Sequence, residues 1–153
     1  MFALKRALKL NKNEATLMVK HAGFRRVLFN MGLSLRTQMY GEGKFSGSKV
    51  INEIKKLLTN HVKKQPGFAG INQLSSRVDQ NALIDLKDAF SRYRLGQSGH
   101  PTLASRRSGL SFTVDSSKGK VVLDAGYTIK IPTLGTFRLH QPWFLRIQAS
   151  TDV

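Results

Sequence analysis

The feature that most constrains the fold is a change in the spacing of apolar residues near Gly109. Before it, apolar side chains recur every three or four residues over three stretches, the period of helices that bury one face. After it, apolar and polar residues alternate in short runs bounded by Gly, Pro and Ser, which is typical of half-buried strands. Because the strands follow the helices instead of alternating with them, we expect an α+β chain with an antiparallel sheet.

The first predicted helix begins at Asn11, whose side chain can accept a hydrogen bond from the first turn. Glu14 completes a capping box, and the helix ends near Gly41 and Gly43. Its apolar stripe consists of Leu17, Phe24, Leu28, Met31 and Leu35. Lys20, Arg25 and Arg26 lie off this stripe, so we expect them to be solvated.

Two further helices are predicted. One lies within "SGSKVINEIKKLLTNHVKKQPG", with Ser48 as a candidate cap and a stop at Pro66 and Gly67. The other opens at Ser76 and ends at Gly96. The apolar stripe of the first is Val50, Ile51, Ile54, Leu57, Leu58 and Val62. That of the second is Val78, Ala82, Leu86, Ala89 and Tyr93, widened by Leu83 and Phe90.

Short strands are predicted in "LSFTVDS", "KVVLDAG", "YTIKIP" and "GTFRLH", with turns between them. The start of the chain, "ALKRALKL", fits either a short strand or the beginning of a helix. As a strand it can join the sheet and help to close it, which would leave fewer exposed edges. The helices would then be an insertion between the first strand and the others.

The charge of the chain indicates its partner. It has 25 Lys and Arg against 9 Asp and Glu, a net charge of +16 and a pI near 10.7. Such a balance favours a nucleic acid, because Lys and Arg release the counterions of phosphates. A secreted or antimicrobial basic protein and a ribosomal component remain alternatives. No apolar run approaches the ~20 residues of a membrane span, and the start lacks a signal-peptide core, so we expect a cytoplasmic protein without membrane contact.

The sequence offers no catalytic set. Without cysteine, it cannot form disulfides, zinc fingers or a thiol nucleophile. No pair of histidines has metal-ligand spacing, and we expect His21 and His61 on helix surfaces. The cluster of Asp79, Asp85 and Asp88 is better explained by surface ion pairs than by acid–base chemistry. "GEGKFSGSK" lacks the spacing of a phosphate-binding loop. We therefore expect no metal, cofactor or small-molecule substrate.

Basic residues interleaved with aromatic ones are the better signal for binding. "FSRYRLG" places Arg92 and Arg94 beside Tyr93, and "SRRSGLSF" places Arg106 and Arg107 shortly before an aromatic residue. Arginines can contact phosphates, and exposed rings can stack on bases. The alternative is that the rings belong to the core and the arginines only solubilise the chain. We expect Phe90 to be a core residue.

Four segments together resemble the N-terminal part of the TnpB (OrfB) proteins of insertion sequences. "RALKLNKNEATLMVKHAGFRRVLFNMGLSL" carries the pattern G-x-x-R-x-x-x-N of that family at Gly23, Arg26 and Asn30. "SSRVDQNALIDLKDAFSRYR" is similar to its Q-x-A-L-x-x-L-x-x-A-F helix, although Asn81 directly precedes the alanine. "GHPTLASRRSGLSF" resembles its G-x-P loop, with Leu103 in place of an aromatic residue. "IKIPTLGTFRL" is close to I-K-L-P-K-L-G-x-V-R, with Thr133 in place of a lysine.

The resemblance implies an RNA-guided DNA endonuclease family encoded by transposons, and a two-part organisation. Residues 1–10 and 105–140 would form a small antiparallel wedge-like β-barrel, incomplete at the C-terminus. Residues 11–96 would form a helical recognition (helix-turn-helix-like) domain inserted after the first strand. Residues 97–104 would be a linker and residues 141–153 a tail outside the family pattern. The implied partners are a structured guide RNA and the double-stranded DNA next to the target.

The resemblance also implies binding residues. The helix that carries Gln80 approaches the target-adjacent DNA, so Ser76 and Gln80 are carried over, and Thr113 less directly. Glutamine suits this role because its amide matches the donor and acceptor of adenine. The nucleic-acid-binding residues that we expect are Lys5, Arg6, Lys9, Lys12, Arg25, Arg26, Ser76, Gln80, Arg92, Arg94, Arg106, Arg107 and Thr113.

Catalysis in that family comes from a RuvC-like domain with metal-binding carboxylates and from a zinc ribbon of four cysteines. Neither is found in these 153 residues, and the similarity stops after "GTFRLH". We therefore expect a fragment that binds nucleic acid without nuclease activity. The alternative is a non-functional, marginally folded remnant of a decayed insertion sequence.

Overall fold

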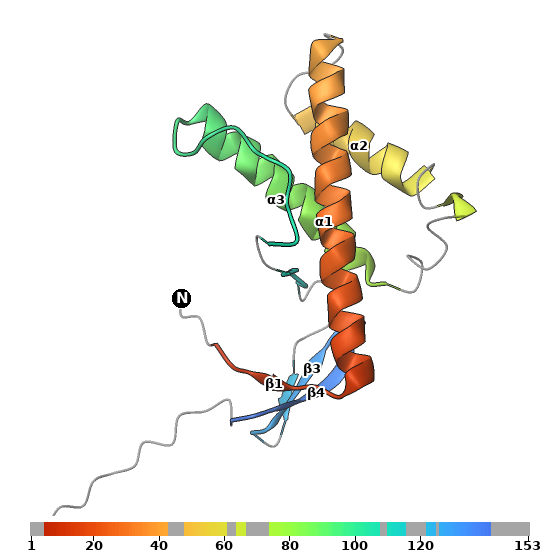
Figure 1. The fold of residues 1–153 in the computed structure, drawn as a ribbon, viewed down its shortest axis with the longest axis vertical. Coiled ribbons are helices and arrows are strands. Elements are labelled where there is room, and N and C mark those ends of the chain that lie inside the picture. The colour runs from red at the N-terminus through yellow and green to blue at the C-terminus, as the bar shows by residue number, and fades with distance from the viewer. Residues whose placement is uncertain are drawn as a thin grey trace, which may run out of the picture. The chain divides into compact units, whose positions relative to one another are not determined.

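The computed structural model describes residues 5–42, 48–60, 64–66, 74–107, 110–115, 122–124 and 126–141. It is an α+β structure with three helices and a four-stranded antiparallel sheet (Figure 1). The order along the chain is β1 (Leu8–Lys9), α1 (Lys12–Gly41), α2 (Ser48–Asn60), α3 (Ser76–Arg94), β2 (Val122–Asp124), β3 (Thr128–Ile131) and β4 (Gly135–Leu139). The three helices were expected from the sequence, and the start of the chain forms a strand, one of the two alternatives that the sequence left open.

The chain divides into two compact units. Met1–Ala15 and Asp115–Val153 form the first, which we call the sheet unit, and Thr16–Val114 form the second, the helical unit. The first turn of α1 lies in the sheet unit, and the rest of that helix lies in the helical unit. Among the helices that the structure describes, none combines the length and the apolar character needed to cross a membrane.

The capping box at the start of α1 is confirmed. The backbone N–H of Asn11 donates to Glu14 Oε2 at 2.8 Å, and the backbone N–H of Glu14 donates to Asn11 Oδ1 at 2.9 Å. Two amides that have no partner within the helix are thereby satisfied. The helix ends at Gly41, as the sequence predicts.

In the helical unit the three apolar stripes meet in one core, with α2 and α3 both crossing α1 (Figure 1). Gly32 marks the closest approach in α1, because a Cβ there would lie 2.9 Å from Leu86 Cδ2 and 3.3 Å from Leu83 Cδ2. The main cluster consists of Phe24, Leu28, Val50, Ile54, Leu58, Val78, Ala82 and Leu83, and a second cluster consists of Phe29, Leu33, Leu86 and Phe90. The core position predicted for Phe90 is thus confirmed, whereas Tyr93 is exposed.

The limits of α2 and α3 follow the sequence prediction over the described residues. The described part of α2 ends at Asn60, while the predicted stripe residue Val62 and the stop at Gly67 lie outside the described residues. α3 opens at Ser76, as the sequence predicts, and the preceding Ser75 is its N-cap, because the Ser75 side chain accepts from the backbone N–H of Arg77. Gly96 follows α3 with a φ of +69°, the left-handed conformation that ends helices.

One predicted strand is absent, because residues 110–115 are described and contain no strand. Phe112 and Val114, whose alternation suggested it, both pack against the core of the helical unit. Alternation alone does not distinguish a strand from an extended segment that covers helices.

The described sheet is open, in the order β1-β4-β3-β2, with all pairs antiparallel. β1 pairs with β4, so the start of the chain does join the sheet, but β1 and β2 remain edges and no barrel closes among the described strands. The link from β3 to β4 is a turn in which the N–H of Leu134 donates to the carbonyl of Ile131. Pro132 follows Ile131, and Thr133 has a φ of 67°, which fits a type II turn.

Candidate nucleic-acid interface

The sheet unit has one basic face and one apolar face. Lys9 stands opposite Arg138 across β1 and β4, and Arg138 stands opposite Thr128 of β3. Lys130 lies two residues along β3 on the same side, and Lys9, Lys130 and Arg138 are all exposed. The other face carries Phe137 and Leu139, which are buried. Three cations therefore share one solvent-facing surface, which we call the basic sheet face.

Only one member of the basic sheet face, Lys9, was expected from the sequence. Lys130 and Arg138 occur in the predicted strands "YTIKIP" and "GTFRLH", but their common face follows from the register of β3 on β4, and Lys9 joins it through the pairing of β1 with β4. A one-residue shift in register would place them on the opposite face. The alternation of each strand was visible in the sequence, and the pairing was not.

The other basic residues expected near the start of the chain lie in the same unit. Lys5 and Lys12 are exposed, and Arg6 is half-buried with Nη1 donating to the carbonyl oxygen of Lys5 at 3.0 Å. Lys12 is the first residue of α1. Lys5 and Lys12 thus add exposed positive charge to the sheet unit.

The expectation that Arg25 and Arg26 are solvated is wrong, since both are half-buried. Arg25 Nη2 donates to Asp85 Oδ2 at 2.7 Å, and its guanidinium carbon lies 5.3 Å from the centre of the Phe29 ring. This ion pair joins α1 to α3, so Arg25 is engaged within the protein. Asp85 does form an ion pair, as expected of the acidic cluster, but with a residue on another helix.

The three residues carried over for DNA recognition lie close together in the helical unit. Ser76 and Gln80 are one turn apart on α3, and Ser76 is exposed. Asn81 Nδ2 donates to the backbone carbonyl of Thr113 at 3.0 Å, which places the segment around Thr113 along the same helix. Gln80 Oε1 accepts from Arg77 Nη1 at 2.5 Å, so this amide is held in a defined orientation.

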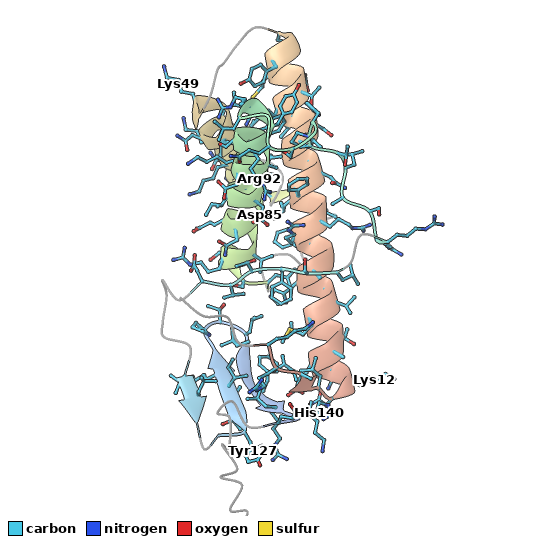
Figure 2. All side chains as sticks on the ribbon, turned by 90° about the vertical axis from the view of Figure 1, so that its left-hand side faces the viewer. Lys12, Lys49, Asp85, Arg92, Tyr127 and His140 are labelled. Carbon is cyan, nitrogen blue, oxygen red and sulfur yellow. The ribbon has the colours of Figure 1, made fainter. Side chains whose placement is uncertain are left out.

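The remaining arginines expected at the interface are exposed. Arg92 and Arg94 occupy the last turn of α3, where cations complement the helix dipole. Arg106 and Arg107 follow a segment that Asn30 anchors: its Nδ2 donates to the carbonyl of Ala104 at 3.0 Å, and the N–H of Ala104 donates to its Oδ1 at 2.8 Å. In Figure 2, Lys49 extends from α2 into solvent, and Asp85 and Arg92 lie on α3.

His21 was expected on the helix surface and is instead 1% exposed. Its Nδ1 lies 2.8 Å from the carbonyl oxygen of Leu17, which can only accept, so Nδ1 donates. Its Nε2 then accepts from the backbone N–H of Ser75 at 3.1 Å. The ring also stacks on Phe112. His21 is therefore a structural residue that holds the N-cap of α3. The expectation for His61 lies outside the described residues.

No three His, Asp or Glu side chains in the described ranges come close enough together to hold a metal ion. Sequence reasoning also missed a buried arginine. Arg36, in α1, is 3% exposed. Burial lowers the pKa of Arg36, and the positive charge of Arg94 lowers it further, while Tyr40 opposes both effects. An arginine stays protonated at neutral pH even so, which makes Arg36 a buried cation.

No protein-family model matches this sequence, and no curated protein is significantly similar to it. The likeness to TnpB/OrfB proteins consequently rests on the four motifs quoted from the sequence.

Proposed function

We propose that the chain binds nucleic acid, with the basic sheet face as a contact for the phosphate backbone. The observation that carries the proposal is that Lys9 stands directly opposite Arg138 while both are exposed. Like charges directly opposite each other across a sheet are destabilising on their own. Two phosphate groups, one bound at each cation, would offset this repulsion and release condensed counterions.

We further propose the partners that the TnpB/OrfB resemblance implies, a structured guide RNA and the DNA duplex beside its target. In this proposal Ser76, Gln80 and Thr113 read the duplex, and the basic sheet face positions the backbone. This division agrees with the general rule that phosphate contacts position a protein and base contacts specify the sequence. Ser76 and Gln80 lie one turn apart on α3, and Asn81 of the same stretch binds the backbone carbonyl of Thr113, which supports the proposal.

The proposed activity is binding without nuclease chemistry of its own. The chain has 9 acidic residues and no cysteine. Asp85, in the middle of the acidic cluster, is occupied by its ion pair with Arg25. The organisation proposed is that of the family: a helical segment placed between the first strand of a wedge-like domain and the rest of it.

The alternative hypothesis of a marginally folded remnant is supported by the sheet unit, whose strands have two to five residues and whose described sheet is open. Such short sheets are weakly stable by themselves. A thermal melt distinguishes the two hypotheses, since a cooperative transition supports a folded binding protein and its absence supports the remnant.

The test of the proposed function is the salt dependence of binding to a labelled hairpin RNA and to a DNA duplex. For duplex DNA the slope of log K against log salt is about −0.9 per phosphate contact. The variant Lys9→Gln/Arg138→Gln removes two contacts, so the slope should become less steep by about 1.8. The matched control, Lys55→Gln/Lys87→Gln, removes the same charge from two exposed lysines of the helical unit and should leave the slope nearly unchanged.

The outcomes have distinct meanings. If neither RNA nor DNA binds the wild-type chain at low salt, the proposed function is wrong. If both double variants reduce the slope equally, binding follows net charge and the basic sheet face is not the site. Sequence recognition is tested separately with Gln80→Ala. This variant should lower the preference for the duplex that the wild-type chain binds best, relative to other sequences, by about 1–3 kcal/mol without affecting nonspecific binding.

A further inference from the structure

A cavity of about 320 Å³ opens in the helical unit between the last turns of α1 and α3 and the loop after α3. Arg36 and Tyr40 line it from α1, Phe90, Tyr93 and Arg94 line it from α3, and His100 lines it from the loop. Its volume is at the lower end of the range for small-ligand sites, roughly 300–1,000 Å³. The site is therefore large enough for one small molecule or for one unit of a polymer.

The cavity contains a cation without an anion. The Arg36 guanidinium lies over the Phe90 ring, with Cζ 3.6 Å from the ring centre, and Nη2 donates to the Tyr40 hydroxyl at 3.4 Å. Its Nε is buried without a hydrogen-bond partner. Within the described residues no carboxylate pairs with Arg36, and Arg94 brings a second positive charge. Buried charges are normally paired, so the arrangement lacks an anionic group.

Aromatic rings surround the same cavity. Tyr40 is 46% exposed and Tyr93 is 43% exposed. The His100 ring meets Tyr93 edge to face with centroids 5.1 Å apart, and Phe90 with centroids 5.4 Å apart. Exposed rings beside cations are the combination that binds unpaired bases, through stacking on the ring and charge on the phosphate.

We propose that this cavity binds an unpaired nucleotide, with the base against the rings of Tyr40 and Tyr93 and the phosphate at Arg36 and Arg94. The nucleotide comes either from a single-stranded segment or from the free pool, because both present the same ring and phosphate. The proposal deepens the proposed function by adding a recognition element for unpaired nucleic acid. It rests on a cavity whose lining belongs entirely to the helical unit and not on the basic sheet face.

The experiment is a titration of the full chain, followed by the NMR signals of the His and Tyr rings and by calorimetry. The probes are adenosine monophosphate, adenosine, inorganic phosphate, phenyl phosphate and a short single-stranded oligonucleotide. We expect adenosine monophosphate to bind more tightly than adenosine or phosphate, since only it uses both parts of the site. Tighter binding of the oligonucleotide would show that the site binds single-stranded nucleic acid. Tighter binding of adenosine monophosphate would show that it binds a free nucleotide. Either result supports the site.

The decisive variant is Arg94→Gln, because Arg94 is exposed and its replacement leaves the core intact. This variant should weaken the binding of adenosine monophosphate about tenfold or more, the value of one hydrogen bond to a charged group. The matched control is Arg92→Gln, which removes the same charge from the same turn of α3 but does not line the cavity. It should change the affinity by less than about twofold. Arg36→Met should abolish binding, and circular dichroism reports whether its helices are intact.

Several results would overturn the inference. They are the absence of binding by the nucleotide and the oligonucleotide alike, an equal loss in Arg92→Gln and Arg94→Gln, or tighter binding of phenyl phosphate, which would indicate a phosphotyrosine site. The proposed function fails by a different result, the absence of salt-dependent RNA and duplex binding. A chain that binds duplex DNA but no unpaired nucleotide therefore refutes this inference alone.

Discussion

The helical unit and the sheet unit bury their apolar side chains to very different degrees. In the described part of the sheet unit, the buried apolar side chains are Phe137 and Leu139, while Val122 and Leu123 are 46% and 40% exposed. All the largest fully buried side chains belong to the helical unit: His21, Leu28, Val50, Ile54, Val78 and Leu86. Close packing in the helical unit contrasts with a thin, one-sided core in the sheet unit.

Under the proposed function, this difference predicts a different kind of binding for each unit. A well-packed core fixes rotamers, so it can hold a buried cation such as Arg36 and a shaped cavity beside it. A short, open sheet instead offers a row of charges, and backbone contacts to phosphates need little shape. We therefore expect selective contacts in the helical unit and salt-sensitive contacts in the sheet unit.

The largest expected effect separates the two units. Phe137→Ala should lower the free energy of unfolding by about 3–5 kcal/mol and Leu86→Ala by about 2–5 kcal/mol, the usual ranges for large-to-small changes in a core. Because Phe137 is one of only two buried apolar side chains in the described sheet unit, its loss should unfold that unit while α2, α3 and the part of α1 after Ala15 remain folded. Amide hydrogen exchange in each variant measures the protection of both units.

The contrast between the two units would be refuted if Phe137→Ala also removed amide protection from α2 and α3, since the two units would then unfold as one. Leu86→Ala is the reciprocal variant, because its loss of amide protection should appear first in the helices. Val122→Ala serves as a control of similar chemistry at an exposed position of the sheet and should cost no more than about 0.5 kcal/mol.

A second prediction concerns the buried hydrogen bonds of the helical unit. His21→Leu leaves the backbone N–H of Ser75 without its acceptor, and an unsatisfied buried donor costs about 1–3 kcal/mol. Urea unfolding followed by far-UV circular dichroism measures the loss. Lys20→Leu introduces the same residue at the exposed neighbouring position and should cost about 0.5 kcal/mol or less. Equal costs in the two variants would show that His21 contributes only its volume.

A third prediction tests how tightly α1 packs, with two glycines of the same helix. Gly23→Ala should stabilise the protein by about 0.8–1.0 kcal/mol through helix propensity, because nothing lies within 4 Å of the added Cβ. Gly32→Ala receives the same gain but forces Leu86 to move, which costs about 1–3 kcal/mol. The difference between the two free energies of unfolding isolates packing. Equal stabilisation by both would mean that the core is loose at Gly32.

The helices and the strands after Gly126 could be predicted from the sequence because their signals are local. The capping box of Asn11 and Glu14 involves residues three apart, and the apolar period of α3 lies within one segment. The β3–β4 hairpin follows from alternation and a turn. Each of these elements is determined by neighbours in sequence, so reading the chain is sufficient.

The features that could not be predicted depend on contacts between distant residues. His21 is buried because Ser75, 54 residues away, donates to it. Phe112 lies in no strand because the helical core accepts its ring. Arg36 looks like an ordinary polar residue of α1 until Phe90 and Tyr40 enclose it. The candidate sites were harder to predict than the elements for the same reason, since partners define them.

A similarly small effect is expected at Thr133, in the turn between β3 and β4. Position three of a type II turn needs a positive φ, which Gly and Asn adopt easily and a β-branched residue does not. Thr133 has a φ of 67°, so Thr133→Asn should stabilise the sheet unit by about 1 kcal/mol. Thr136→Asn is the control, since it makes the same change within β4 and relieves no strain. The measurement is hydrogen exchange in β3 and β4. Slower exchange in Thr133→Asn alone would show that this strain limits the sheet, and an unchanged rate would mean that its exposed edges do.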